Sequence, residues 1–366
     1  MTESFENENM ENTNPEGITP QDSNETGATG GINFEKTEAT ESENINFTSR
    51  LDLAELQKSI TAVKEEISSV IVGQSKMIDQ LLVAILSNGH VLLEGVPGVA
   101  KTISAKLLSK TLSLHFSRIQ FTPDLMPSDI LGTSVFDMSK SAFTFKKGPI
   151  FSNFVLIDEI NRAPAKTQAA LFEVMEERQI TVEGTTYPME APFLVIATQN
   201  PIEQEGTYRL PEAQLDRFLF KINIDYPNLS EEIAILQREN ALQDREKLDK
   251  IKKVLSQSDI IKYQGIVKQI VIEPQLLEYI AKIVTSTRDN AFLYLGASPR
   301  ASIAILNASK GYAALRGRDF VTPEDIKESA VPVLQHRVMV APEREMEGLT
   351  SEQIIRQIID TVEIPR

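Results

Sequence analysis

Eight consecutive residues have the types and spacing needed to bind a phosphate chain: Gly95-Val96-Pro97-Gly98-Val99-Ala100-Lys101-Thr102. They follow an apolar run, His90–Glu94, that predicts a buried strand, and they precede a run that predicts a helix, Ile103–Leu108. The two glycines let the backbone turn tightly and approach a ligand, and N–H groups at a helix start point at phosphate oxygens. We expect Lys101 to contact the β- and γ-phosphates of ATP and the Thr102 hydroxyl to ligate Mg²⁺.

Two carboxylates follow a second apolar run. Phe154–Ile157 predicts a central parallel strand, and Asp158 and Glu159 come directly after it, at the edge where open α/β sheets bind ligands. We expect Asp158 to hold Mg²⁺ and Glu159 to polarise the attacking water, while the metal and Lys101 stabilise charge on the transferred phosphoryl group. A solvated acidic strand end is the alternative, and the preceding phosphate-binding segment disfavours it.

Two more polar residues, Asn200 and Arg217, each have two possible roles. Asn200 follows the apolar run Phe193–Ala197, so its amide is able to contact the γ-phosphate and the attacking water; it is equally suited to cap a turn before Pro201. Arg217 follows a run that predicts a helix, Pro211–Asp216. It either pairs with a nearby carboxylate or acts as an arginine finger that enters a neighbouring subunit's site. These residues alone do not decide between the readings.

Two long stretches, Gly148–Pro164 and Ala197–Phe218, resemble the MoxR family of AAA+ ATPases, and the resemblance extends over about residues 50–366. It implies that the phosphate-binding segment is Walker A, that Asp158 and Glu159 form Walker B, and that Asn200 is sensor 1. It also implies that Arg217 is a finger acting in trans.

The resemblance assigns three further residues. Gly296–Arg300 is similar to the start of the sensor 2 helix, so Arg300 would contact a γ-phosphate, in its own site or a neighbour's. Val70–Gln74 resembles the segment that lines the adenine pocket, which implies this role for Gly73 and Gln74. Arg209 departs from the family, which usually has proline there.

The fold class expected is α/β: an AAA+ P-loop NTPase core with a parallel sheet and flanking helices over residues 51–226, then an all-helical lid over 227–366. Residues 1–50 hold 11 acidic and 2 basic residues and few aliphatic ones, so we expect a disordered acidic tail. Two hairpins are also expected in the core, one within residues 133–145 and one within 180–188, from alternating strands around turn residues.

Composition limits the function. The chain has no cysteine and a formal net charge of −15, which argues against a disulfide framework and a broad nucleic-acid surface. The N-terminus lacks a signal-peptide pattern and no run has the length of a membrane span, so we expect a cytoplasmic protein.

The resemblance implies an ATP-hydrolysing, chaperone-like remodelling ATPase in a homo-oligomeric ring, favouring a hexamer, with von Willebrand factor A domain proteins as partners. Alternatives are the motor of a metal-chelatase-like complex and a nucleic-acid motor.

Overall fold

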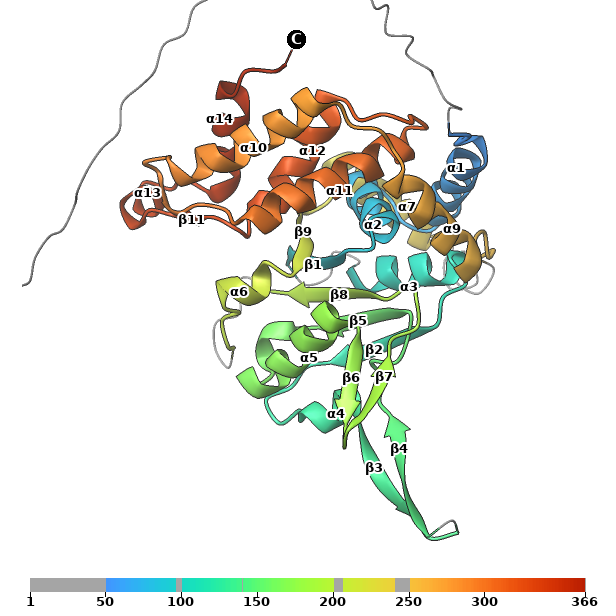
Figure 1. Ribbon diagram of the computed structural model, residues 1–366. Coiled ribbons are helices and arrows are strands. Elements are labelled where there is room, and N and C mark those ends of the chain that lie inside the picture. The colour runs from blue at the N-terminus through green and yellow to red at the C-terminus, as the bar shows by residue number, and fades with distance from the viewer. Residues whose placement is uncertain (1–50, 97–100, 140, 201–206, 241–250, 366) are drawn as a thin grey trace, which may run out of the picture. The chain divides into compact units, whose positions relative to one another are not determined.

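Five parallel strands form the sheet that positions the predicted site (Figure 1), in the order β2-β5-β8-β1-β9. The computed structural model describes residues 51–365 apart from 97–100, 140, 201–206 and 241–250; the predicted tail of residues 1–50 lies outside them. The strands are β1 (His90–Gly95), β2 (Phe116–Gln120), β5 (Phe154–Asp158), β8 (Leu194–Gln199) and β9 (Phe218–Ile224). The predicted parallel sheet is confirmed, and its two edge strands, β2 and β9, are additions that the sequence did not predict.

Helices cover both faces of this sheet. Alternate residues of β1 enter two separate apolar clusters, because side chains of a strand point to opposite faces: Val91 and Leu93 join one cluster, and Leu92 joins the other. The first cluster includes α1 (Ala54–Ser68), α2 (Ser75–Leu86) and α3 (Lys101–Thr111). The second includes α4 (Pro127–Leu131), the 3₁₀ turn η1 (Ile160–Arg162) and α5 (Ala165–Glu177).

Both expected hairpins are present. One consists of β3 (Gly132–Asp137) and β4 (Ala142–Lys147), and the other of β6 (Gln179–Val182) and β7 (Thr185–Pro188). They lie side by side in Figure 1, and the rings of Phe145 and Tyr187 contact each other with 4.6 Å between their centroids. The two hairpins therefore form one connected feature.

A helical lid follows the core, as predicted. Short α6 (Glu212–Leu215) precedes β9. Among the described residues, the helices after β9 are α7 (Leu229–Asn240), α9 (Gln257–Lys268), α10 (Pro274–Arg288), α11 (Pro299–Leu315), α12 (Pro323–Leu334), α13 (Pro342–Met346) and α14 (Ser351–Thr361). Proline in the first turn begins α10, α11 and α12, where its missing N–H has no helical partner to lose. Two short antiparallel strands, β10 (Leu293–Leu295) and β11 (Met339–Val340), lie between these helices and were not predicted.

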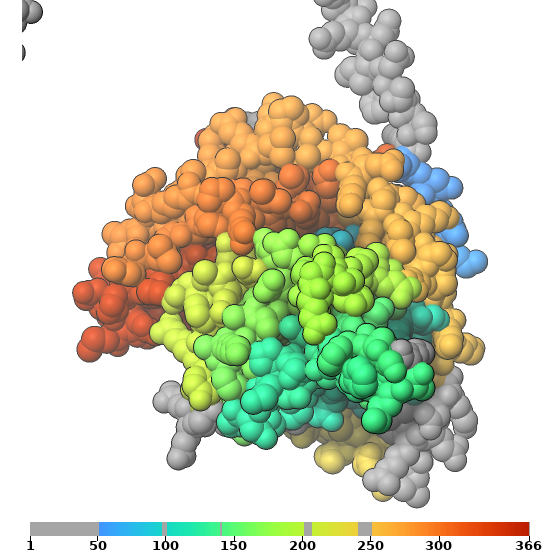
Figure 2. Space-filling view, turned by 60° about the horizontal axis from the view of Figure 1, so that its bottom comes forward, coloured from blue at the N-terminus to red at the C-terminus, as the bar shows by residue number. Residues whose placement is uncertain are grey.

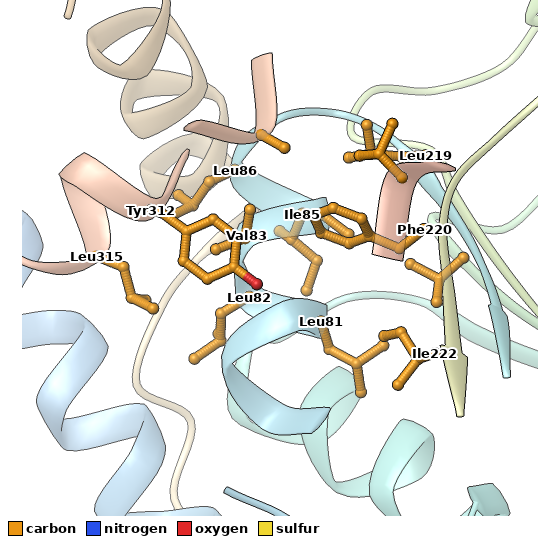
Figure 3. Close-up of a cluster of buried hydrophobic side chains, with 14 of the residues drawn as sticks. Leu81, Leu82, Val83, Ile85, Leu86, Leu219, Phe220, Ile222, Tyr312 and Leu315 are labelled. Carbon is orange, nitrogen blue, oxygen red and sulfur yellow. The ribbon is translucent and has the colours of Figure 1, made fainter. Parts of the chain in front are cut away.

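Helix α2 joins the sheet to the lid. Figure 3 shows its apolar side chains packed beside Phe220 of β9 and Tyr312 of α11, whose ring centroids lie 6.4 Å apart. One apolar cluster runs from α1 and α2 through β9 into α9–α12, and each large side chain buried there contributes about 1.5–3 kcal/mol. The domain boundary expected near residue 226 stays a prediction. Within the described part of the chain, no helix combines the length and apolarity that crossing a bilayer requires.

Two buried histidines connect elements of this core while uncharged. The His90 ring donates from Nε2 to the Met175 carbonyl of α5 (3.1 Å) and accepts the Val195 N–H of β8 at Nδ1 (3.0 Å); burial lowers its pKa to about 3. The His336 Nε2–H donates to the Phe218 carbonyl (3.0 Å), and burial lowers the pKa of this ring well below 6.5. Protonating either ring in the folded state is therefore unfavourable.

Mild acid should destabilise the fold. Between pH 7.5 and 5.5 the unfolded chain gains protons at His90 and His336 that the folded chain does not bind. Stability is therefore full above pH 6.5 and falls below it, by up to ~1.4 kcal/mol per pH unit for each ring. Urea unfolding followed by far-UV circular dichroism at both pH values measures this loss. A double His90→Gln, His336→Gln variant should show a shallower pH dependence, and an equal slope in the two proteins would contradict the assignment.

Candidate active site

The predicted phosphate segment lies where β1 ends and α3 begins. Pro97, Gly98, Val99 and Ala100 lie outside the described residues, whereas Gly95, Val96, Lys101 and Thr102 lie within them. The Lys101 ammonium donates to the Gly95 carbonyl (2.7 Å) and lies 3.5 Å from the Gln199 carbonyl of β8. A Cβ on Gly95 would stand 2.8 Å from the Ile224 carbonyl oxygen. Close approach of β9 is thus a reason for glycine here that differs from the ligand contact expected from sequence.

The two predicted carboxylates stand at the same edge of the sheet, one strand beyond β8. The Asp158 carboxylate is buried, pairs with Arg118 Nε of β2 (2.6 Å) and accepts the Thr198 hydroxyl (3.3 Å). Glu159 has a left-handed backbone, with φ of 58°, and its N–H donates to the same Thr198 oxygen (3.1 Å). One hydroxyl therefore orients both acidic residues.

The Glu159 carboxylate is held from two sides. Gln120, the last residue of β2, donates to it from Nε2 (2.9 Å), and Arg162 Nε lies 3.0 Å away. Asn200 directly follows β8, which lies between β1 and β5, and it is buried. The structure thus places Lys101, Glu159 and Asn200 at one edge of the sheet, and their roles stay a prediction.

The two predicted arginines lie at the opposite edge. Arg217 precedes β9, whose first residue pairs with His90 at the start of β1, so the six residues of β1, about 17 Å, separate it from the phosphate segment. Its Nη1 donates to the Phe172 carbonyl of α5 (2.7 Å) and lies 3.7 Å from Glu176. Arg300, at the start of α11, also pairs with Glu176 (3.1 Å). Glu176 therefore brings the two arginines together, which the sequence did not predict.

The predicted adenine segment lies between α1 and α2. Gly73 and Gln74 both have left-handed backbones, with φ of 68° and 57°, and a Cβ on Gly73 would meet the Glu231 carboxylate of α7 at 2.3 Å. Gln74 Nε2 donates to the Asp225 carbonyl (3.3 Å). An open cavity of about 270 Å³ is lined by Gln74, Tyr226 and Glu231 among others. The segment thus faces the chain where β9 leads into the lid.

The donor set suits Mg²⁺ bound together with phosphates. Among the described residues, no three His, Cys, Asp or Glu side chains are grouped to hold a metal ion. Mg²⁺ usually takes one or two protein carboxylates and fills its remaining positions with phosphate oxygens and water. One buried carboxylate, Asp158, and one hydroxyl, Thr102, fit that mode and do not make a metal site by themselves.

Several residues at the two edges were missed from the sequence. Arg118 and Gln120 belong to β2, whose short mixed run gave no strand signal, and Glu176 ends a helix that carried no motif. Only the position of Gln120 could have indicated a role, because it ends the strand that pairs with β5, the strand that leads to Glu159. Thr198 lies within the stretch Ala197–Phe218 that resembles the family, but the sequence analysis assigned it no role.

Together, the parallel sheet, the phosphate segment at the end of β1 and the helical lid define an AAA ATPase. Residues 90–220 match the family described as ATPase family associated with various cellular activities (AAA), and residues 285–358 match the AAA lid domain.

Similar proteins show which family within the AAA class this chain belongs to. The chain is 44% identical to the chaperone MoxR1 of Mycobacterium tuberculosis over 82% of this chain and 81% of that protein. It is 46% identical to an uncharacterised Bacillus subtilis protein, YeaC, over 82% and 93% respectively. A crystal structure of a candidate ATPase from Cytophaga hutchinsonii superposes with a TM-score of 0.79, at 44% identity, covering 86% of this chain and 97% of that one. The chain belongs to the MoxR family of AAA ATPases.

Replacing Thr198 tests the shared hydroxyl. Thr198→Val keeps the side-chain volume but leaves the Glu159 N–H and one Asp158 oxygen without their partner, which should lower the unfolding free energy by about 1–3 kcal/mol. Thr198→Ser keeps the hydroxyl and should cost clearly less. Urea unfolding of the three proteins measures both effects; equal losses in the two variants would mean that the hydroxyl does not matter.

Proposed function

We propose that this chain hydrolyses ATP with Mg²⁺ at sites completed between subunits of a homo-oligomeric ring. One observation carries the proposal: Arg217 and Arg300 lie at the edge of the sheet opposite to Glu159, with β1 and α5 between the two edges. Arg217 does not reach its own phosphate segment across about 17 Å, and Arg300 is paired with the same Glu176 as Arg217. We therefore propose that both arginines serve a neighbour's site, including Arg300, for which the sequence left open its own site or a neighbour's.

The residues at the carboxyl edge have complementary roles in this proposal. Lys101 and the remainder of Gly95–Thr102 bind the phosphates, and Thr102 and Asp158 hold Mg²⁺, which neutralises phosphate charge. Glu159, oriented by Gln120 and Thr198, polarises the attacking water. Asn200 contacts the γ-phosphate and this water, as its two-way amide allows. Gly73 and Gln74 border the adenine.

The arginines complete the transition state from the neighbouring subunit. A guanidinium presents several N–H donors in a fixed plane and stays charged, so it is suited to stabilise negative charge on the transferred phosphoryl group. Members of the AAA class are typically oligomeric, and a ring of head-to-tail contacts gives every subunit one donor face and one acceptor face. A hexamer is our preferred ring size.

For the partner, we propose chaperone-like remodelling of von Willebrand factor A domain proteins. Membership of the MoxR family supports this, as does the similarity to a protein named a chaperone. The hairpin β3–β4 offers a contact surface, because Phe136, Met138 and Phe143 are exposed. ATP-dependent retention of a purified von Willebrand factor A domain protein by the immobilised chain would support the proposal. Activity that depends on a tetrapyrrole or on DNA would favour the chelatase-like or nucleic-acid alternatives.

Mixing two inactive variants tests the arrangement between subunits. Glu159→Gln should bind ATP without turning it over, since the water is no longer polarised. Arg217→Ala should also bind ATP and lose turnover, because an arginine finger contributes about 10³-fold or more. A 1:1 mixture should regain about a quarter of wild-type turnover per subunit, because half the sites keep Glu159 and half of those meet an intact Arg217 in a head-to-tail ring.

Steady-state phosphate release from wild type, each variant and the mixture, at equal total subunit concentration, measures this. Mass determination with and without ATP shows whether rings form. A mixture no more active than its components would show that Arg217 does not act in trans. Full turnover by Glu159→Gln would remove this residue from the proposed mechanism.

A further inference from the structure

The end of α12 meets the segment that carries Arg217 through a buried arginine. The Arg337 side chain is 4% exposed, and its Nε lies 2.6 Å from Asp216 Oδ1. Its Nη2 donates to the carbonyls of Asp216 (2.9 Å) and Phe218 (2.6 Å), and Nη1 donates to that of Leu219 (3.2 Å). The residues on both sides of Arg217 are thus bound by one side chain from the lid.

Asp216 receives a second contact from the lid. Ser298, which precedes α11, donates its hydroxyl to Asp216 Oδ2 (3.1 Å), two residues before Arg300. The Asp216 carboxylate therefore binds the end of α12 with one oxygen and the start of α11 with the other. Arg217 and Arg300, which follow these two contact points in the chain, both pair with Glu176.

These contacts surround Arg217 without involving the chain's own phosphate segment. Figure 2 shows the yellow-green surface around residues 207–220 adjoining the red surface of the C-terminal part of the lid. His336 adds a hydrogen bond to the Phe218 carbonyl, and Gln335 accepts from Asn223 of β9 (3.0 Å). Residues 335–337 of the lid thus bind the backbone just after Arg217 and the strand that follows it.

The chemistry of arginine explains why this position is sensitive. A guanidinium offers five N–H donors in a rigid plane, so it can bind a carboxylate and several carbonyls at once. Lysine offers three donors at a single point and cannot reproduce the arrangement. Burial lowers the pKa of Arg337, and the hydrogen bond and charge of Asp216 oppose that shift.

We propose that Arg337 is a positioning residue that holds Arg217 and Arg300 in one rigid unit with the lid, so that the lid of one subunit carries both arginines to its neighbour's nucleotide site. The inference rests on the proposed hydrolysis between subunits. It adds that the geometry of a site depends on the lid contacts of the adjacent subunit, not on those of the subunit that binds the nucleotide.

The test is Arg337→Lys in the full chain. Alone it should bind a fluorescent ATP analogue as wild type does, and turn over ATP about 10- to 100-fold more slowly, the usual effect of a misplaced catalytic group. Mixed 1:1 with Glu159→Gln, it should regain turnover to the level of the Arg217→Ala/Glu159→Gln mixture, since its own site is intact and its neighbour supplies the arginines. Mixed with Arg217→Ala it should regain nothing, because neither subunit supplies them.

Two further variants keep the test decisive. Arg356→Lys changes an exposed arginine of the same lid that pairs with Glu352 (2.7 Å), and it should turn over ATP as wild type does. Asp216→Asn keeps the side-chain volume and one acceptor oxygen, and it should behave in mixtures as Arg337→Lys does. Thermal unfolding shows whether Arg337→Lys folds. If it does not fold, the Asp216→Asn mixtures test the inference in its place.

The outcomes separate the two proposals. If the Arg217→Ala mixture regains turnover but neither the Arg337→Lys nor the Asp216→Asn mixture does, Arg337 serves the fold or its own subunit's site, and the inference is wrong. If the Arg217→Ala mixture itself regains nothing, hydrolysis between subunits is wrong and the inference falls with it.

Discussion

The direction of five parallel strands is the constraint on which the rest of the site depends. Parallel strands bring all their carboxyl ends to one edge, so residues that follow β1, β5 and β8 meet there although they are far apart in the chain. The residue before β9 stands, for the same reason, at the other edge. The carboxylates and the arginines cannot be exchanged between edges without reversing a strand. Their separation is therefore built into the topology.

The contact of Asp216 with Arg337 shows how the lid is joined to this sheet. Removing a charged side chain from water is unfavourable, and a buried pair is stable only where further hydrogen bonds satisfy its remaining donors. Here backbone carbonyls of Asp216, Phe218 and Leu219 do so. Rotating the lid away from β9 about residues 226–228 would leave these groups unpaired in an apolar setting, a cost of several kcal/mol. We infer that the lid and β9 move together.

Local patterns predicted much of this fold, and long-range contacts account for what they missed. The runs before Gly95, Asp158 and Asn200 are short and aliphatic, so each predicted a buried parallel strand ending in polar residues, and the lid helices were predicted from helical spacing of apolar residues. Arg337 and Asp216 are 121 positions apart, and nothing in the composition around either distinguishes a buried ion pair from two solvated charges. Sequence spacing likewise left Arg300 open between two sites, because that choice depends on where α11 begins relative to α5.

Helix α5 is the element that connects the two edges within a subunit. It begins just after Glu159 and η1, and it ends at Glu176 and Glu177 beside the arginines. Its 13 residues span about 20 Å, which matches the length of β1 beside it. Arg178 fixes its end to the turn before β1 through the Asn88 side chain (2.7 Å) and carbonyl (2.6 Å).

Hairpin β6–β7 follows α5 directly, and Tyr187 of this hairpin packs on Phe145 of the other. A displacement at the Glu159 end of the helix therefore has a continuous packed route to two places: the Glu176 carboxylate, which pairs with Arg217 and Arg300, and the hairpins. If hydrolysis occurs between subunits as proposed, a change at one site has a route along helix α5 to the arginines and to the hairpins. Such a route is what the proposed function requires, because hydrolysis at a nucleotide site has to change the shape of a distant surface.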